Sequence, residues 1–99
     1  MRFEWDETKN RANIRMHGVD FRDAVYAFAD PHALNIPDDE HSEGEHSEGE
    51  ERWVLLGLGA DHRLLLVVHT DRSHGAIRLI SARAATRNER TSYQARLRR

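Results

Sequence analysis

Three apolar segments separated by short polar connectors constrain the fold of this chain more than any other feature. Residues 52–58, 63–70 and 76–82 are rich in aliphatic and β-branched side chains, and the connectors between them contain Gly, Asp and His. Short turn-rich connectors join neighbouring strands that run in opposite directions, so the pattern predicts an antiparallel meander. Residues 64–68 are apolar at every position, which is typical of a central strand covered on both faces.

Two helices are expected before the meander. Asp6 is a suitable N-cap for a helix over residues 7–16, and Gly18 can end it in the left-handed conformation. Asp20 is expected to cap a second helix, and Asp30-Pro31 stops it because proline restricts the residue before it. The apolar side chains of this second helix fall at helical spacing on one face: Phe21, Ala24, Val25 and Phe28.

Two short strands and a last helix complete the predicted fold. Residues 3–5 alternate like a strand, and residues 33–36 form another, which Pro37 closes. A helix is expected from Arg87, because Thr86 and Glu89 have the spacing of a capping box. The order of elements predicts an α+β domain in which two N-terminal helices and one C-terminal helix pack on an antiparallel sheet.

The composition bounds the class of protein. With 99 residues, the chain is expected to form one domain, residues 1–99, with a modest core. The absence of Cys excludes disulfides, Cys-ligated metal sites and thiol catalysis. The longest aliphatic run is five residues and the N-terminus lacks an apolar signal segment. We therefore expect a cytoplasmic protein without a membrane span.

Charge is distributed unevenly along the chain. Residues 38–51 contain eight of the 17 acidic side chains and neither Lys nor Arg, and residues 40–49 repeat Glu-His-Ser-Glu-Gly twice. This segment has nothing to place in a core, so it predicts a mobile acidic loop. The remaining residues carry an excess of basic side chains, which indicates either a basic working surface or a set of solvated helix faces.

The first helix carries one group of candidate site residues. Lys9, Asn13 and His17 are four residues apart and so share one stripe of the helix. A cation, an amide and an imidazole aligned in this way could hold a phosphate or move a proton. An ordinary solvent-exposed face, with a His near the helix C-terminus, fits the spacing as well.

Two strand residues are further candidates. Strict alternation places His69 on the same strand face as Arg63, and it places Arg78 on the same face as Ile80 and Ala82. A polar side chain at the end of an apolar strand face often marks the rim of a cleft. A lone strand His is also common as a structural residue, and both interpretations stay open for His69.

The last helix carries the densest group of candidates. Arg83, Arg87 and Arg90 are spaced to lie near one side of this helix and the turn before it, and guanidinium groups bind phosphate in bidentate fashion. Tyr93 lies one turn beyond Glu89, where it would stack on a base or cap the core with its ring. Glu89 fits either acid-base chemistry or the capping box alone.

Motifs for several other chemistries are absent. The sequence contains no nucleophile elbow, phosphate-binding loop, dinucleotide-binding glycine pattern, zinc-protease motif or EF-hand loop. His41 and His46 are five residues apart among carboxylates, a spacing that matches no zinc pattern. We therefore expect neither a metal nor a cofactor.

Short segments along nearly the whole chain resemble, in the same order, the BrnT family of bacterial type II toxins. They are Phe3-Glu4-Trp5-Asp6, Lys9, Asn13, His17-Gly18-Val19, Phe28-Ala29-Asp30-Pro31, Gly49-Glu50-Glu51-Arg52, Val67-Val68-His69-Thr70, residues 77–83, and Ala85-Thr86-Arg87-Asn88-Glu89-Arg90 with Tyr93. The sequence departs from the family at Met16, where members carry Lys, and in having two acidic repeat units instead of one.

The resemblance implies a RelE-like fold and a ribonuclease toxin that arrests translation by cutting RNA. It also implies a BrnA-type ribbon-helix-helix antitoxin that neutralises the toxin and carries the complex to operator DNA. The main hypothesis is therefore a metal-independent endoribonuclease. Its expected catalytic residues are His17, His69, Arg78, Arg83 and Glu89, and its expected RNA contacts are Lys9, Arg63, Arg87, Arg90 and Tyr93. The alternative, favoured by Met16, is a toxin-fold module without catalytic activity that acts as a co-repressor with its antitoxin.

Overall fold

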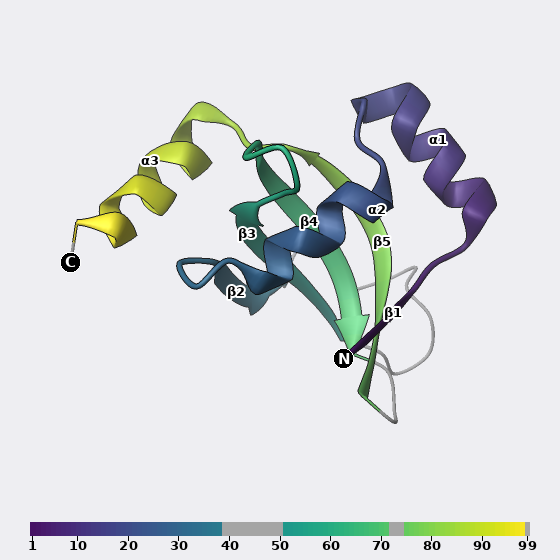
Figure 1. Ribbon diagram of the computed structural model, residues 1–99. Coiled ribbons are helices and arrows are strands. Elements are labelled where there is room, and N and C mark those ends of the chain that lie inside the picture. Colours follow the sequence, from purple (N-terminus) through teal and green to yellow (C-terminus); the bar gives the residue numbers. More distant parts are fainter. Residues whose placement is uncertain (39–50, 72–74, 99) are drawn as a thin grey trace.

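The helices and strands of the protein follow the predicted order. The structure is a computed structural model that describes residues 1–38, 51–71 and 75–98 (Figure 1). Its elements are β1 (Arg2–Glu4), α1 (Glu7–His17), α2 (Phe21–Ala24), the 3-10 helix η1 (Val25–Ala29), β2 (Leu34–Pro37), β3 (Arg52–Leu58), β4 (Leu64–Asp71), β5 (Ala76–Ala84) and α3 (Arg87–Leu97). Of the predicted acidic loop at about residues 38–51, residues 39–50, which include the repeat, lie outside the described residues. Within the described part of the chain, no helix is long and apolar enough to cross a membrane.

The five strands form one sheet in the order β1-β5-β4-β3-β2. β2, β3, β4 and β5 are antiparallel neighbours with β4 in the middle of the sheet, which confirms the predicted meander and its central strand. β1 departs from the predicted antiparallel sheet, because it runs parallel to β5 with Glu4 opposite Arg78. β1 ends opposite the first part of β5, and α1 then follows along the same side of the sheet beside β5 (Figure 1).

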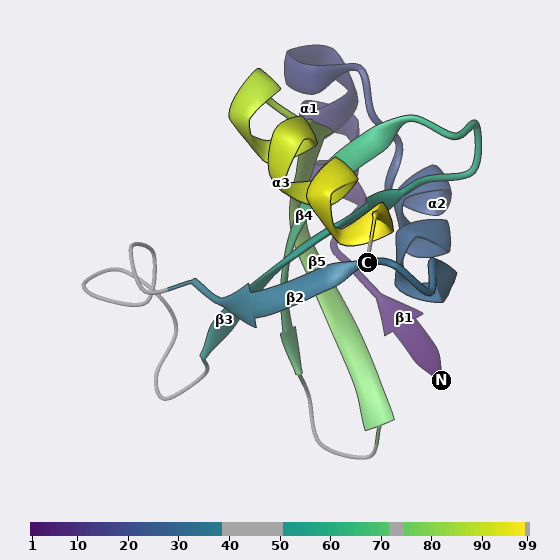
Figure 2. The same ribbon diagram turned by 90° about the vertical axis from the view of Figure 1, so that its left-hand side faces the viewer.

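The main core lies between one face of the sheet and the α2–η1 segment, which runs along that face (Figure 2). Its buried side chains are Val19, Phe21, Ala24, Ala27, Leu55, Leu65, Val67, Ile77, Leu79 and Ala82. Phe21 and Ala24 are fully buried, and Val25 and Phe28 pack against the core. The apolar face predicted for the second helix is therefore confirmed, although the helix tightens from α to 3-10 after Ala24.

Two asparagine side chains fix α1 to the rest of the chain. Asn13 Nδ2 donates to the carbonyl oxygens of Val19 (2.9 Å) and Ala82 (2.8 Å), and Asn13 Oδ1 accepts from the Ala82 N–H at 3.1 Å. Asn10 is also buried, and its Oδ1 accepts from the Phe21 N–H at 2.9 Å. Because both amides satisfy buried backbone groups, α1 docks through hydrogen bonds rather than through a broad apolar face.

Both ends of α1 have the predicted caps. The Asp6 side chain accepts hydrogen bonds from the N–H groups of Thr8 and Lys9. Gly18 has a φ of 69°, in the left-handed region, and its N–H donates to the Ile14 carbonyl oxygen at 2.8 Å. Glycine adopts this conformation without the steric penalty of a side chain, so the chain turns sharply there towards α2.

An extra residue in β5 interrupts its pairing with β4. Val68 of β4 lies opposite Ser81 of β5. The next residue of β4, His69, lies opposite Leu79, so Ile80 is the extra residue. Such a β-bulge shifts the alternation of side chains by one position in the strand that contains it.

The bulge decides which side chains of β5 enter the core. Beyond it, Ala82 lies in the main core together with Leu79, while Arg83 lines a cleft on the other face. Strict alternation from Leu79 would place Ala82 outside and Arg83 inside. The prediction that Arg78 and Ala82 share a face is therefore wrong, because the bulge lies between them.

α3 extends away from the sheet and is held at few points (Figure 1). The predicted capping box at its start is confirmed: the Glu89 N–H donates to Thr86 Oγ1 at 3.2 Å, and the Thr86 N–H donates to Glu89 Oε1 at 2.9 Å. One turn further, Tyr93 is buried in a small apolar cluster with Leu56 and Leu64. These contacts place the first half of α3 beside β3 and the cleft.

Candidate active site

A cleft of about 540 Å³ opens on the face of the sheet opposite the main core. Its floor is apolar, because alternate residues of β2, β3 and β4 point to this face while their neighbours point into the core. The floor residues are Leu34, Ile36, Val54, Leu56, Leu66 and Val68, and the polar lining residues are His17, Asp38, Ser81, Arg83, Glu89 and Ser92. Three predicted catalytic residues, His17, Arg83 and Glu89, thus meet in one cleft, although they come from α1, β5 and α3.

Arg83 and Glu89 form a two-pronged ion pair in this cleft. Arg83 Nη1 donates to Glu89 Oε1 and Arg83 Nη2 donates to Glu89 Oε2, both at 2.9 Å. Nη1 also donates to the Ala84 carbonyl oxygen at 3.1 Å. The two side chains are 36% and 26% exposed, so solvent reaches the pair from the open side of the cleft.

The ion pair keeps both groups charged. Hydrogen bonds from Arg83 hold the pKa of the Glu89 carboxyl below its ordinary value against the opposing effect of burial, and the Thr86 N–H adds to the lowering. The same hydrogen bonds raise the pKa of Arg83. Glu89 is therefore a carboxylate at neutral pH, which can accept a proton, and Arg83 is a fixed cation beside it.

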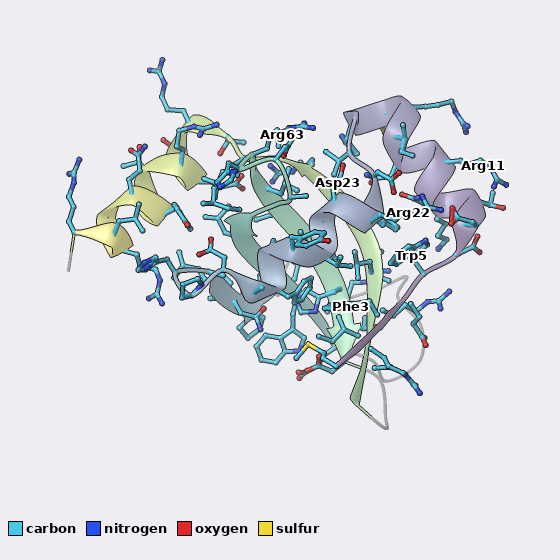
Figure 3. All side chains as sticks on the ribbon, in the orientation of Figure 1. Phe3, Trp5, Arg11, Arg22, Asp23 and Arg63 are labelled. Atoms are coloured by element: carbon cyan, nitrogen blue, oxygen red, sulfur yellow. The ribbon has the colours of Figure 1, made fainter. Side chains whose placement is uncertain are left out.

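His17 reaches the cleft because α1 ends there. It is the last residue of α1, and Gly18 turns the chain immediately after it. Arg63 lies beside this turn, where its Nη1 donates to the Gly18 carbonyl oxygen at 3.2 Å (Figure 3). Lys9 is exposed two turns before His17, whereas Asn13 between them is buried. The stripe predicted on the first helix is therefore not one continuous polar surface.

His69 lies on the core side of the sheet, away from the cleft. Its side chain is 1% exposed, and its ring stands edge-on to the Phe28 ring with 4.8 Å between the centroids. Its Nε2 lies 3.2 Å from Asn35 Oδ1. Burial disfavours the charged imidazolium and lowers the pKa of His69 to about 4. This placement fits the structural interpretation of His69 better than the catalytic one.

Arg78 and Tyr93 also lie outside the group that lines the cleft. Arg78 Nη1 is 3.4 Å from Glu4 Oε2, at the edge where β5 pairs with β1. Tyr93 is 4% exposed, and its hydroxyl donates to Asp30 Oδ2 at 2.6 Å. Burial, together with this hydrogen bond, raises the pKa of Tyr93 to about 12. The Tyr93 ring caps the small apolar cluster and offers no open face on which a base could stack.

The arginines predicted to share one basic face are divided between two sides of α3. Arg83 lines the cleft, next to Glu89 on the inner side of the helix. Arg87 and Arg90 are exposed and do not belong to the residues that line the cleft. Arg87 and Glu89 are two positions apart on α3 and so point in different directions, which separates Arg87 from the Arg83–Glu89 pair.

Three polar residues of the cleft are not anticipated from the sequence: Asp38, Ser81 and Ser92. Asp38 is 8% exposed, and its N–H donates to the Arg52 carbonyl oxygen at 2.8 Å, which continues the pairing of β2 with β3. Alternation from Leu34 through Ile36 is the signal that could have placed Asp38 on the cleft face. No comparable signal exists for Ser81, since its direction depends on the bulge.

The chemistry of the cleft rests on charged and hydrogen-bonding groups. Among the described residues, no group of three or more His, Asp and Glu side chains could hold a metal ion. A guanidinium can stabilise negative charge on a phosphoryl group, while a carboxylate and an imidazole can accept and donate protons. Arg83, Glu89 and His17 supply these three functions on one surface.

Comparison with known proteins identifies similar sequences and folds. A family model for the ribonuclease toxin BrnT of type II toxin-antitoxin systems matches residues 5–89. The crystal structure of the Brucella abortus ribonuclease toxin BrnT is similar, with 26% sequence identity and a TM-score of 0.65 over 88% of this chain and 99% of that chain. No curated protein sequence matches the chain.

Proposed function

Because this chain belongs to the BrnT family of ribonuclease toxins of type II toxin-antitoxin systems, we propose that its cleft cleaves RNA without a metal ion and thereby arrests translation. The observation that carries the proposal is the convergence of His17, Arg83 and Glu89 in one cleft from three separate elements. These side chains provide an imidazole, a guanidinium and a carboxylate, which is the set of groups that phosphodiester cleavage by the neighbouring ribose hydroxyl requires.

The proposed reaction assigns one role to each of these residues. The ribose 2′-oxygen attacks the adjacent phosphorus as its proton passes to the Glu89 carboxylate. Arg83 stabilises the additional negative charge on the pentacoordinate phosphorane. The bond from phosphorus to the 5′-oxygen then breaks, and His17 donates a proton to that oxygen. The products are a 2′,3′-cyclic phosphate and a free 5′-hydroxyl.

The free enzyme keeps donors available for this reaction. Arg83 uses Nη1 and Nη2 for Glu89 and Nη1 for the Ala84 carbonyl oxygen, and its guanidinium has five N–H donors in total. The remaining donors can meet a phosphate while Glu89 stays beside the 2′-hydroxyl. Arg63, exposed at the turn after His17, is the proposed contact for a neighbouring phosphate. His69, Arg78 and Tyr93 have no part in this mechanism, because they do not line the cleft.

A cleavage assay tests this proposal directly. The purified chain is incubated with RNA in EDTA, the fragments are separated on a gel, and their 3′ ends are analysed for cyclic phosphate. Glu89→Gln, His17→Gln and Arg83→Lys should each lower kcat by about a hundredfold or more, because each removes a proton-transfer or charge-stabilising group. Arg83→Lys also tests geometry, since lysine keeps the charge but loses the planar fork.

The controls separate catalysis from folding. Arg11 is exposed on α1 (Figure 3) and does not line the cleft, so it supplies the matched control Arg11→Lys, which should cleave RNA like the unaltered chain. The circular dichroism spectra of all variants should match that of the parent. Absence of cleavage by the parent chain, together with tight antitoxin binding, would contradict the proposal and support a non-catalytic co-repressor module.

The partner of a type II toxin is an antitoxin, and we propose a BrnA-type ribbon-helix-helix protein for this chain. The proposal rests on membership of the BrnT family. Operator DNA would then be bound through the antitoxin rather than by the toxin. An antitoxin that binds only the folded toxin raises its melting temperature by mass action. An unchanged melting temperature at saturating antitoxin would contradict this assignment.

A further inference from the structure

α3 has two faces that differ in burial and in chemistry. Its inner face contains Glu89, Tyr93 and Arg96, which are partly or fully buried and are spaced by four and three residues. All three make side-chain hydrogen bonds, to Arg83, Asp30 and the His32 carbonyl oxygen respectively. The outer face consists of exposed residues at helical spacing: Arg87, Arg90, Thr91 and Gln94 of α3, and Arg98 at its C-cap.

The outer face carries arginines at both of its ends. Within residues 1–38, 51–71 and 75–98, the structure shows no carboxylate paired with Arg87, Arg90 or Arg98. The one acidic residue of α3, Glu89, points to the cleft and is neutralised by Arg83. The positive charge of the outer face is therefore available to an external anion.

We infer that the outer face of α3 binds the phosphate backbone of the RNA strand that leaves the cleft. This inference rests on the proposed function, and it adds a second contact surface outside the catalytic cleft. Arg87 lies two residues from Glu89, so the outer face begins next to the cleft. With a rise of about 1.5 Å per residue, Arg87 and Arg98 are separated by about 16 Å along the helix, long enough to meet successive phosphates of one strand.

The chemistry of the outer face favours RNA over a protein partner. The buried centres of protein interfaces are usually rich in aromatic or large apolar side chains. The outer face contains none, and the large apolar side chain beside it, Leu97, is 47% exposed. Arginine, threonine and glutamine side chains are instead typical donors to phosphate oxygens, which position a nucleic acid without reading its sequence.

A pair of double variants tests the inference against a matched control. Arg90→Gln/Arg98→Gln removes two charges from the outer face of α3. Arg11→Gln/Arg15→Gln removes two charges from the exposed surface of α1 and leaves the same net charge. The ligand is a fluorescent single-stranded 2′-O-methyl RNA of about twenty nucleotides, which has no free 2′-hydroxyl and so cannot be cut. Its Kd is measured by fluorescence anisotropy over a range of salt concentrations.

Loss of two phosphate contacts has a defined signature. For single strands, the slope of log Kobs against log salt changes by about 0.7 per contact, so Arg90→Gln/Arg98→Gln should reduce its magnitude by about 1.4. If the α3 double variant and the parent bind equally at 1 M salt, this change in slope makes the Kd of the variant about 25-fold higher than that of the parent at 0.1 M salt. In the cleavage assay, KM for a long RNA should rise more than KM for a tetranucleotide, which is too short to extend along α3.

Three outcomes would overturn the inference. Equal effects of the α1 and α3 double variants would show a general charge effect, and an unchanged slope for the α3 variant would show that the face does not touch RNA. Loss of antitoxin binding with unchanged RNA affinity would make the face a protein surface. A parent chain that binds the RNA with the expected slope but cleaves none would overturn only the proposed function.

Discussion

α1 and α3 are both eleven-residue helices with capped N-termini, yet they are attached to the sheet in different ways. α1 is docked by the amides of Asn10 and Asn13, which are buried and satisfy backbone groups. α3 is attached through the buried Tyr93 and through partly exposed polar contacts of Glu89 and Arg96. The attachment of α1 is neutral and buried, whereas that of α3 includes a charged pair that solvent can reach.

The difference shows that two helices of equal length can contribute unequally to the free energy of unfolding, although each supplies a residue to the cleft. Buried hydrogen bonds are costly to break, because each backbone group left without a partner has lost its contact with water. Ion pairs near the surface contribute less to folding but keep ionised groups accessible to a substrate. The two helices therefore predict different responses to mutation, and four experiments test the contrast.

Asn13→Ala should have the largest effect on folding. It removes three hydrogen bonds and leaves the Val19 carbonyl and both backbone groups of Ala82 without their partner. We expect a loss of about 3 kcal/mol in the free energy of unfolding, measured by urea denaturation. The control on the same helix, Arg11→Ala at an exposed position, should change it by less than about 0.5 kcal/mol. A small loss for Asn13→Ala would mean that α1 is not docked by its amides.

Tyr93→Phe tests the corresponding attachment of α3. It keeps the buried ring and deletes the hydroxyl that donates to Asp30 Oδ2, leaving the Leu58 N–H as the other donor to that oxygen. A hydrogen bond to a charged acceptor contributes about 2 kcal/mol, so the loss should be smaller than for Asn13→Ala. Hydrogen exchange should quicken mainly in α3. Uniformly faster exchange across the sheet would show that α3 is as central to folding as α1.

The N-caps should not distinguish the two helices. Asp6→Ala and Thr86→Ala each remove a side-chain oxygen that accepts from the first turn, and each should cost about 1 kcal/mol in thermal or urea unfolding. Near-equal losses would show that α1 and α3 differ in stability through their contacts with the rest of the protein and not through their N-caps. A Thr86→Ala loss several times that of Asp6→Ala would assign it to the capping box instead.

The Arg83–Glu89 ion pair should contribute least to stability, less than about 1 kcal/mol, since both side chains are partly exposed. The folded pKa of Glu89 lies below its ordinary value of 4.5, so its contribution is present above that pH and is lost as the pH falls through the folded pKa. The pKa of His69 is lowered to about 4 in the folded protein, so the unfolded chain binds a proton at His69 first and the free energy of unfolding also falls below pH 6.5. Both the parent and Glu89→Gln contain His69, so the difference between their free energies of unfolding reports the contribution of Glu89 alone.

In that experiment, unfolding is followed by urea denaturation from pH 7 to pH 3. The stability difference between the parent chain and Glu89→Gln should shrink as the pH falls below 4.5, while His69 affects both proteins alike. A difference that does not change with pH would mean that Glu89 stabilises α3 through the shape of the capping box and not through its charge.

Local signals account for the parts of the structure that the sequence predicts well. The caps at Asp6, Gly18 and Thr86 depend on backbone groups within a few residues of each cap, so short windows of sequence reveal them. The meander depends on short connectors between apolar runs, which are equally local. For the cleft, the prediction depends on the family resemblance, because the segments that resemble the BrnT family include His17 and Arg83.

Non-local contacts explain what the sequence does not predict. Asn13 is buried because its side chain bonds to backbone groups of Ala82, which is 69 positions away in the sequence. Burial of Tyr93 depends on Asp30, 63 positions away. The bulge at Ile80 reverses the alternation that otherwise allows Arg83 to be assigned to a face, and nothing in the strand itself marks the extra residue.

The parallel pairing of β1 with β5 has a consequence for the order of events during synthesis. The first strand of the chain finds its neighbour only at residues 76–78, and Asn13 of α1 finds its partner only at Ala82. Contacts between such distant segments form late and slowly, because a long loop must close before they are made. A nascent chain halted before residue 83 has neither the docked first helix nor a finished cleft. The residues that line the cleft are therefore brought together only after β5 and α3 have been synthesised.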